Sequence, residues 1–218
     1  MLEHRKLYSQ FVARFAAGAK ALRVGNGLEP KTQMGPCVNA SQLGTVEEYV
    51  RIGKAEGATL LAGGSRLGSG EHARGYFHEP TIFGDCSPKM RVAHEEIFGP
   101  VVSVIPVGSL EEAIEVGNSV DYGLSASIYT QDVNRAFTAM REMYTGIFYV
   151  NAPTIGAETH LPFGGIGPSG MGRYHGRKSF ETFSNMRALV FKSTLIDLPI
   201  RYPPYTKRKT RILSLLMR

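Results

Sequence analysis

Apolar residues recur at helical spacing over the first quarter of the chain. Between residues 7 and 22 they lie on one face of a helix, namely Leu7, Phe11, Val12, Phe15, Ala19 and Leu22. The glycines of "GNG" at 25–27 predict the end of this helix. A second helix is predicted after "MGPCVNAS" at 34–41, with Gly57 near its end. Its apolar side is formed by Leu43, Val46 and Val50. The chain is therefore predicted to begin with two amphipathic helices.

Short apolar runs bounded by turn residues predict strands farther along. "TLLAGG" at 59–64 predicts a strand that enters an exposed Gly/Ser-rich loop, "GGSRLGSGEHARG" at 63–75. "VVSVIPV" at 101–107 is a continuous run rich in β-branched residues, which is typical of a strand covered on both faces. "LSASIYT" at 124–130 and "GIFYVN" at 146–151 predict two more strands.

Helix-capping residues separate the later strands. Ser109 and Glu112 have the spacing of a capping box, and Asp132 can cap the helix "DVNRAFTAMREM". Three apolar residues of that helix share a face: Val133, Phe137 and Met140. The β-α-β-α-β order predicts right-handed crossovers and an α/β fold, with a largely parallel open sheet between flanking helices. After Asn151 the pattern gives way to a Gly/Pro-rich segment, and "RALVFK" at 187–192 predicts an edge strand.

Composition is that of an ordinary globular protein. The chain has 218 residues, of which 43% are apolar and 20% charged, and a chain of this size buries about 70% of its unfolded surface. No run approaches the ~18 apolar residues of a membrane span, and "MLEHRKLYSQF" lacks the apolar core of a secretory signal. The two cysteines lack C-x-x-C spacing, which fits a reducing compartment. We expect a cytoplasmic protein.

The net charge of +6 belongs to the C-terminal tail. Residues 201–218 hold six basic residues and no acidic one, whereas the rest of the chain carries 19 basic and 19 acidic residues. A solvated basic terminus is the first interpretation. The second is weak docking on an anionic membrane or on a partner, because basic residues precede the short apolar run "ILSLLM". Nucleic acid is not an expected partner.

The segment Gly165-Ile-Gly167-Pro-Ser-Gly170 has the G-x-G-x-x-G form of a dinucleotide-binding turn. Such a turn must follow a strand at once and open a helix, so that the pyrophosphate sits on the helix N-terminus. Here the nearest predicted strand ends about a dozen residues earlier, and Pro168 and Gly172 are poor helix formers. We therefore interpret the segment as a tight loop in which glycines allow sharp turns or close approach.

"HEEIFGP" at 94–100 places two adjacent carboxylates before a predicted buried strand. If Glu95 or Glu96 faces a ligand, its carboxylate can accept hydrogen bonds from ribose hydroxyls. The alternative is a solvated acidic turn with Phe98 in the core. No metal site is predicted, because the six histidines show no ligand spacing.

These patches together resemble the second half of an aldehyde dehydrogenase. The similar stretches are "EEIFGPVVSVIPVGSLEEAIEVGNSVDYGLSASIYT", "GIFYVNAPT", "LPFGGIGPSGMGRYHGRKSFETFS" and "ALRVGNGLEPKTQMGPCVN". The tail "DLPIRYPPYTKRK" is similar to class 3 members, and "NAPTIGAETHLPFGG" to members that oxidise semialdehydes. The resemblance implies a truncated catalytic domain at 1–186, a terminal oligomerisation strand at 187–200 and a basic tail at 201–218.

The resemblance also implies roles for particular residues. Four would lie at the cofactor: Glu96 at the nicotinamide ribose, Phe98 and Leu124 by the nicotinamide, and Gln42 near the adenosine end. Three would line the aldehyde site, namely Asn151, Thr154 and Phe163. In this family a cysteine thiolate attacks the aldehyde, hydride passes to NAD or NADP, and a glutamate activates the water that releases the acid.

Neither that nucleophilic cysteine nor that glutamate is expected among these 218 residues. Cys37 and Cys86 stand where relatives carry apolar residues, and a free cysteine is most often a small buried hydrophobe. We therefore assign no catalytic residue, and expect no activity and weak NAD(P) binding from this chain alone.

Two hypotheses about function remain. In the first, the chain is the C-terminal part of an aldehyde dehydrogenase and works with a complementing N-terminal half. In the second, it is a non-catalytic pseudoenzyme that serves as an assembly or interaction module. A homo-oligomer is expected from the terminal strand. A sheet without its companion strands exposes an edge and an apolar face that need cover under either hypothesis.

Overall fold

Short, mostly parallel strand pairs with flanking helices form an α/β fold in the computed structural model. The residues that the structure describes are 1–155, 158–192, 195, 200 and 202–216. They form two compact units, residues 1–180 and residues 181–218.

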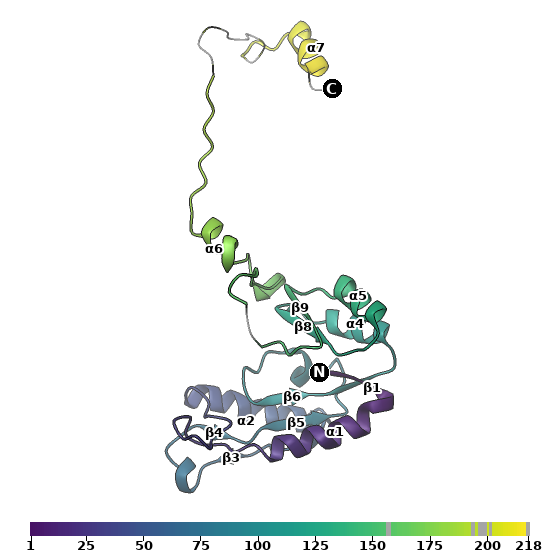
Figure 1. Ribbon diagram of the computed structural model, residues 1–218, viewed down its shortest axis with the longest axis vertical. Helices are drawn as coiled ribbons and strands as arrows, with labels where there is room; N and C mark the ends of the chain where they lie inside the picture. The colour runs from purple at the N-terminus through teal and green to yellow at the C-terminus, as the bar shows by residue number, and fades with distance from the viewer. Residues whose placement is uncertain (156–157, 193–194, 196–199, 201, 217–218) are drawn as a thin grey trace. The chain divides into compact units, whose positions relative to one another are not determined.

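A three-stranded sheet lies at the centre of the first unit. β5 (Thr81–Gly84) is its middle strand, antiparallel to β2 (Thr59–Ala62) and parallel to β6 (Val101–Ser103). Helices α1 (Arg5–Lys20) and α2 (Ala40–Ala55) cover its two faces, and Figure 1 shows β5 between them. The strand predicted at 59–64 is confirmed, whereas β5 was not predicted.

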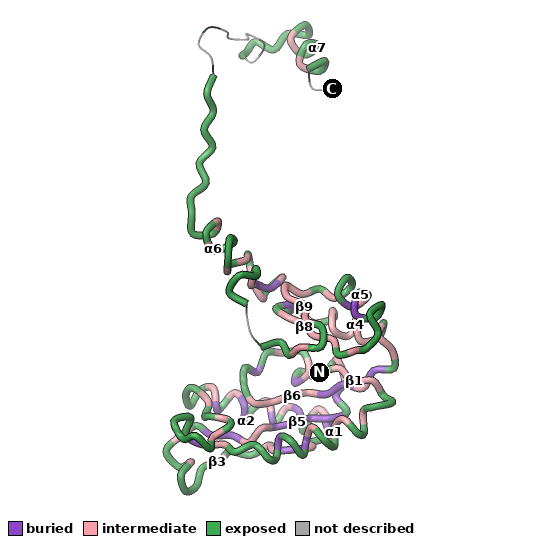
Figure 2. The backbone as a smooth tube through the Cα atoms, in the orientation of Figure 1, coloured by how far each residue is buried: buried purple, intermediate pink, exposed green. Residues whose placement is uncertain are grey.

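Alternation along β5 divides the core between the two helices. Successive side chains of a strand point to opposite faces. Ile82 packs in a buried cluster with Ala16 and Ala19 of α1, while Phe83 packs in a second cluster with Val46 of α2. Figure 2 shows these buried positions along β5 and on the facing turns of both helices.

Both predicted N-terminal helices are confirmed, but the first ends earlier than expected. Asn39 caps α2, because its side-chain oxygen accepts a hydrogen bond from the Gln42 N–H at 2.8 Å. α1 ends at Lys20, five residues before the predicted stop at Gly25. The Gly25 N–H instead donates to the Met34 carbonyl at 3.0 Å, so Gly25 belongs to the loop that follows the helix.

The run predicted as one strand at 101–107 forms two. After β6 ends, β7 (Ile105–Val107) pairs in parallel with β1 (Leu2–His4), an N-terminal strand that was not predicted. The prediction of a single strand is therefore wrong, although the run is extended on both sides of the break.

The break lies at Val104, which is fully buried. Its N–H donates to the Phe83 carbonyl at 2.8 Å, and its carbonyl accepts from the Cys86 N–H at 3.1 Å. One residue later the Ile105 N–H donates to the Met1 carbonyl at 2.9 Å. The strand is divided because hydrogen bonding passes from one neighbouring segment to another at this residue.

The remaining described strands pair two by two. β3 (Arg66–Leu67) is antiparallel to β4 (Phe77–His78), and β8 (Ser125–Ile128) is parallel to β9 (Ile147–Val150). Within the described residues the strands form four small sheets, and the predicted α/β fold with parallel strands between flanking helices is confirmed. The predicted strands at 124–130 and 146–151 are confirmed as β8 and β9.

Helices α4 (Leu110–Asn118) and α5 (Val133–Glu142) precede and follow β8. Ser109 caps α4 as predicted, but the Glu112 carboxylate accepts from the Gly108 N–H at 2.6 Å rather than from Ser109. Asp132 caps α5 through the Asn134 N–H at 2.9 Å and the Arg135 N–H at 3.3 Å.

The apolar face predicted on α5 is present but not covered. Val133, Phe137 and Met140 are all exposed, with Phe137 at 60%. The buried side chains of α5 are the small ones, Ala136 and Ala139. Within the described residues, α5 therefore directs its large apolar side chains outward.

Four further short helices are described: η1 (Gly70–His72), α3 (Arg91–His94), η2 (Gly167–Ser169) and α6 (Gly176–Thr182). They were not predicted. In the second unit, α7 (Lys207–Leu216) lies within the basic tail. Of all the helices in the described ranges, none is both long and apolar enough to cross a bilayer.

The edge strand predicted at 187–192 is not formed by this chain alone. These residues are described and exposed, but pair with no described strand. The physical reason is that a strand needs a neighbour to bond its backbone. Of the wider segment predicted at 187–200, residues 193–194 and 196–199 lie outside the described residues.

Candidate functional site

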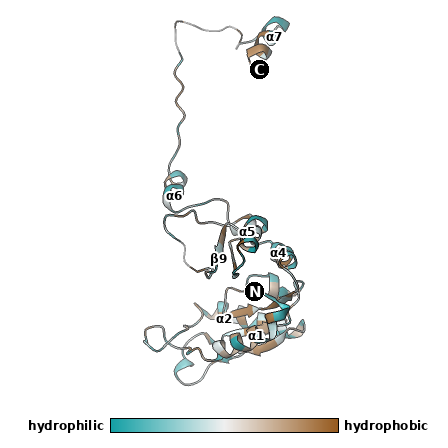
Figure 3. Ribbon diagram, turned by 45° about the vertical axis from the view of Figure 1, so that its right-hand side comes forward, coloured by the Kyte–Doolittle hydropathy of each residue, from teal (hydrophilic) through white to brown (hydrophobic). Residues whose placement is uncertain are grey.

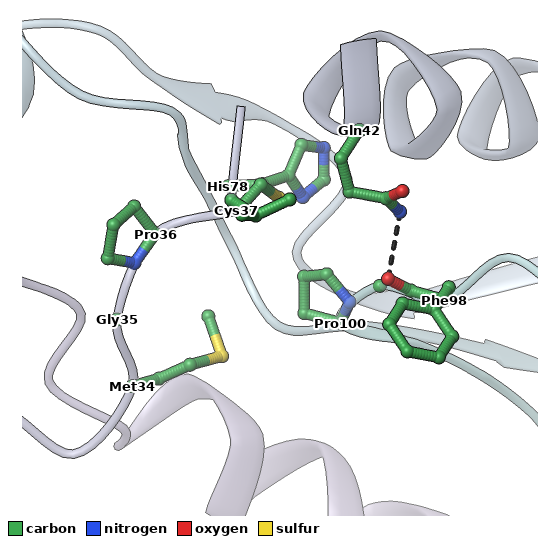
Figure 4. Close-up of a pocket in the computed structure, with 10 residues that line it drawn as sticks. Met34, Gly35, Pro36, Cys37, Gln42, His78, Phe98 and Pro100 are labelled. Atoms are coloured by element: carbon green, nitrogen blue, oxygen red, sulfur yellow. Dashed lines mark hydrogen bonds between the residues drawn. The ribbon is translucent and has the colours of Figure 1, made fainter. Parts of the chain in front are cut away.

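A pocket of about 350 Å³ lies between the loop before α2 and the loop before β6. Two residues that the resemblance places at the cofactor, Gln42 and Phe98, are among its lining residues. The others are Met34, Gly35, Pro36, Cys37, Val38, His78, Gly99 and Pro100. Figure 4 shows Gln42 and Phe98 meeting at one side of this pocket.

Gln42 holds the backbone of the loop that carries Phe98. Its Nε2 donates to the Phe98 carbonyl at 2.8 Å, drawn in Figure 4, and to the Ile97 carbonyl at 2.9 Å. The amide is thus bonded to the protein itself. Its position in the first turn of α2, three residues after the Asn39 cap, places it opposite this loop.

Phe98 points outward, and its neighbour Ile97 points inward. Phe98 has a φ of 54°, in the left-handed region that bulky residues rarely adopt, and its side chain is 81% exposed. Ile97 is buried with 9% exposure in the cluster around Phe83. The alternative that put Phe98 in the core is therefore wrong, because Ile97 takes that place.

The two adjacent carboxylates have different surroundings. Glu95 accepts from Arg91 Nε at 2.9 Å and from Tyr49 Oη at 2.5 Å. The hydrogen bonds from Arg91 and then Tyr49 lower the pKa of Glu95 to about 2. Glu96 is exposed and makes no hydrogen bond or ion pair with any described residue. Of the two carboxylates, Glu96 is the one available to a ligand.

Both cysteines lie in settings that favour the protonated thiol. Burial raises the pKa of Cys37, which lines the pocket, and the pKa of Cys86, which is buried in the core. The thiolate is the nucleophilic form of cysteine. Neither cysteine has the environment of an activated nucleophile.

Leu124 and Asn151 stand at opposite ends of the β8–β9 ladder. Leu124 directly precedes β8 and is exposed. Asn151 directly follows β9 with a φ of 54°, and its side-chain amide bonds both the N–H and the carbonyl of Thr130 at 2.9 Å. Asn151 therefore ties the end of β9 to the end of β8. Thr154 is exposed in the loop that follows.

The G-x-G-x-x-G segment forms a packing loop. Gly167 begins the three-residue helix η2 (Gly167–Ser169), so the segment opens no α-helix, and β9 ends at Val150. Ser169 Oγ accepts from the Gly123 N–H at 3.0 Å. A Cβ placed on Gly146 would overlap the Gly164 carbonyl oxygen. The interpretation as a tight loop of closely approaching backbones is confirmed.

Phe163 is held at the start of that loop. Its backbone forms an antiparallel bridge with Tyr174, with N–H to carbonyl distances of 2.8 and 3.0 Å. Its ring lies 5.4 Å from the Tyr174 ring and 5.4 Å from the His175 ring, centroid to centroid. An aromatic cluster therefore fixes Phe163.

Not all predicted site residues line one pocket. Gln42 and Phe98 line it, and Glu96 lies two residues away along the chain. The other four predicted residues are not among its lining residues: Leu124, Asn151, Thr154 and Phe163. In the described ranges no three His, Cys, Asp or Glu side chains gather as metal ligands.

Sequence reasoning missed Tyr49 and Arg91, which position Glu95. A signal for Tyr49 was present, because residues seven apart lie on one helical face and Tyr49 follows Gln42 by seven. Both side chains of α2 bond the 95–98 segment.

Comparison with known proteins identifies the family. Residues 1–189 match the family described as "Aldehyde dehydrogenase family". The α-ketoglutarate semialdehyde dehydrogenase of Haloferax volcanii is 48% identical over 164 residues, which is 75% of this chain and 33% of that protein. The α-ketoglutaric semialdehyde dehydrogenase of Bacillus subtilis is 36% identical over 187 residues, or 85% of this chain and 38% of that protein.

A solved structure agrees with these matches. The betaine aldehyde dehydrogenase of Staphylococcus aureus in complex with NAD⁺ superposes with a TM-score of 0.81 at 31% identity. The superposition covers 84% of this chain and 36% of that one, so the chain spans little more than a third of the length of these relatives. Since the family match takes in most of the 218 residues, the chain belongs to the aldehyde dehydrogenase family.

Proposed function

We propose that this chain supplies the C-terminal part of the catalytic domain of an aldehyde dehydrogenase that oxidises an aldehyde to a carboxylate with NAD or NADP. The family match over residues 1–189 carries the proposal. The reactive cysteine thiolate and the nucleotide-binding domain would come from sequence that these 218 residues do not include. We therefore expect the chain to act together with a complementing N-terminal portion.

Glu96 and Phe98 fit the nicotinamide end of the cofactor. An ionised carboxylate only accepts hydrogen bonds, and Glu96 has no competing partner among the described residues, so it can hold ribose hydroxyls. The exposed Phe98 ring offers an apolar surface beside it. Gln42 acts as a positioning residue, because its amide fixes the Phe98 carbonyl. When bound, NAD(P) accepts the hydride that the aldehyde loses.

Cofactor binding by the chain alone should be weak. Glu96, Phe98 and Leu124 would contact only the nicotinamide end, and the Gln42 amide is bonded to protein carbonyls rather than free for the adenosine end. Most of the cofactor surface would thus remain in water.

Asn151, Thr154 and Phe163 are proposed to border the aldehyde. Phe163 offers an aromatic side chain fixed by two neighbouring rings, and Thr154 an exposed hydroxyl. Asn151 positions the start of this segment through Thr130. Two relatives are named for α-ketoglutarate semialdehyde, so this aldehyde is the first substrate to test.

The second candidate is a non-catalytic assembly module. The observation that favours it is the uncovered apolar face of α5, with Val133, Phe137 and Met140, which a second copy of the chain can cover as well as an N-terminal portion can. The two candidates differ in what covers this face and in whether catalysis follows.

Complementation separates the two. The 218-residue chain is co-expressed with the part of the Bacillus subtilis relative that lies N-terminal to the matched region, and NAD(P)H formation is followed with α-ketoglutarate semialdehyde. We expect activity from the purified pair and none from either part alone. A Glu96→Gln change should raise the KM for the cofactor in the pair, whereas Glu71→Gln, at an exposed position of η1 that does not line the pocket, is the matched control.

Sedimentation of the same samples tests the assembly module, because it measures whether the chain binds itself or the N-terminal part. Self-association of the chain, with no binding to the N-terminal part and no activity, would favour the assembly module. Activity of the chain alone that survives replacement of both Cys37 and Cys86 would contradict both candidates.

A further inference from the structure

Helix α7 carries two kinds of side chain in succession. Its first five residues include four basic ones, and its last five include four apolar ones. The basic residues are Lys207, Arg208, Lys209 and Arg211, and the apolar residues are Ile212, Leu213, Leu215 and Leu216. Figure 3 shows the change from hydrophilic to hydrophobic along the helix. The helix lies outside residues 1–189, which match the family.

The apolar residues of α7 also share one side. With 3.6 residues per turn, all four fall within an arc of about 160°, and Ser214 lies on the opposite side with Lys207 and Arg211. Arg208 and Lys209 share the side of the apolar residues but precede them along the helix. Leu215 is 75% exposed and Leu216 is 67% exposed. Ile212 is 38% exposed and Leu213 is half-buried, so the apolar residues of this side that are most exposed are Leu215 and Leu216.

The segment before α7 adds aromatic residues. Tyr202 and Tyr205 are both exposed, and Lys209 Nζ donates to the Tyr202 carbonyl at 3.0 Å. Tyrosines are enriched where a protein meets the boundary between water and lipid. Residues 202–216 contain no acidic side chain.

We propose that α7 docks on an anionic lipid surface, lying in the plane of the headgroups. The basic residues would meet the lipid phosphates and carboxylates, and the leucines would enter the acyl boundary. The ten residues are about 15 Å long, half of the ~30 Å hydrocarbon core, so the helix lies on the membrane rather than across it.

The apolar residues of α7 favour a lipid surface over other anionic partners. A nucleic acid or an acidic protein surface would use the positive charge but would leave Leu215 and Leu216 in water. A lipid surface uses both sets of side chains at once. The Ile212, Leu215 and Leu216 side chains are therefore the part of α7 that points to lipid.

Vesicle co-sedimentation of the full chain tests the proposal. We expect binding to vesicles of phosphatidylcholine with phosphatidylserine, little binding to phosphatidylcholine alone, and loss of binding as salt is raised. Each basic residue near such a surface contributes about fivefold in affinity. The triple change Lys207→Glu, Arg208→Glu and Arg211→Glu should thus weaken binding at least tenfold, and it keeps the Lys209 bond to Tyr202.

Two further variants make the test specific. Leu215→Gln with Leu216→Gln keeps every charge and should also weaken binding severalfold. Reversal of three exposed basic residues in the first unit changes the net charge equally and should leave most of the binding. These matched control positions are Arg14, Lys20 and Arg51.

Fluorescence reports how the helix lies. The chain contains no tryptophan, so a single one placed in α7 is a unique reporter. With phosphatidylserine vesicles, Ile212→Trp should shift its emission to the blue, and Ser214→Trp should keep the emission of an indole in water.

Several results would overturn the proposal. These are equal sedimentation with and without phosphatidylserine, unchanged binding by the charge-reversed or leucine variant, or equal emission shifts at the two reporter positions. Binding to RNA that the leucine variant retains in full, with no vesicle binding, would assign the tail to nucleic acid instead.

Discussion

At the residue scale, the segment 95–98 shows how neighbours acquire different roles. Glu95 is held by Arg91 and Tyr49, Glu96 is free of protein partners among the described residues, Ile97 is buried and Phe98 is exposed. The left-handed φ of Phe98 turns its ring away from the core that Ile97 enters. Within this turn, Glu95 and Ile97 make contacts inside the protein, whereas Glu96 and Phe98 remain exposed for contact with a ligand.

Substitutions of Ile97 and Phe98 should therefore have different effects on stability. Ile97→Ala should lower the free energy of unfolding by about 2–4 kcal/mol, because it leaves a cavity in the core. Phe98→Ala should change it by about 0.5 kcal/mol or less, since the ring is exposed. Urea unfolding measures both. Equal destabilisation by the two changes would mean that Phe98 is also a core residue.

The second prediction concerns pH. The Glu95 pKa is lowered from 4.5 to about 2 in the folded chain, so the unfolded chain binds more protons between these values. The stabilisation by Glu95 should be complete above pH 4.5 and disappear as pH falls toward 2. The difference in urea midpoint between the wild type and Glu95→Gln should shrink over this interval. A difference that stays constant over this interval would contradict the prediction.

At the element scale, the loop after β9 joins parts of the chain that the sequence separates. Ser169 bonds the backbone of Gly123 just before β8, and Gly164 lies against Gly146 just before β9. An isolated pair of strands is marginal in water. This loop therefore stabilises the N-terminal ends of β8 and β9 and at the same time fixes Phe163.

The third prediction tests this contact. Gly146→Ala should destabilise the first unit by about 1–3 kcal/mol, because its Cβ would overlap the Gly164 carbonyl, which cannot move without shifting the loop. Gly172→Ala is the matched control, since a Cβ there meets no atom within 4 Å. Thermal unfolding and hydrogen exchange at β8 and β9 measure the effect. Similar melting of the two variants would show that the loop is not packed on these strands.

At the scale of the whole molecule, the first unit leaves apolar surface without cover. The large side chains of α5 point outward, while its alanines face inward. β8 and β9 form a ladder of only two strands. Both features agree with a domain that is completed by further protein, and the complementation experiment tests which protein completes it.

Helix α7 lies beyond the region of the chain that matches the family. Along the chain, the first unit ends at residue 180 and the second begins at residue 181, and the family match ends at residue 189. The basic helix α7 belongs to neither the first unit nor the matched region. Lipid binding through α7 is therefore expected to be independent of catalysis by the first unit, and the leucine variants of α7 should leave the activity of the complemented pair unchanged.

Features that depend on residues close together in the chain could be predicted from the amino-acid pattern. The caps at Ser109 and Asp132, the apolar periods of α1 and α2, and the glycine-rich loop that is no dinucleotide turn were predicted and are present. Such signals extend over a few residues, because a helix cap and an amphipathic period involve side chains three or four positions apart.

The pairing of segments and the choice of exposed side chains depend on contacts between distant parts of the chain, which appear only in the folded structure. The 101–107 run is divided at Val104 because its backbone bonds Phe83 and Cys86 before the next residue bonds Met1. Ile97 is buried and Phe98 is exposed in a segment whose backbone carbonyls are held by Gln42, 55 and 56 residues earlier. These hydrogen bonds join residues that are distant in the sequence. The local pattern of apolar and polar residues does not specify which distant group a backbone N–H or carbonyl will bond.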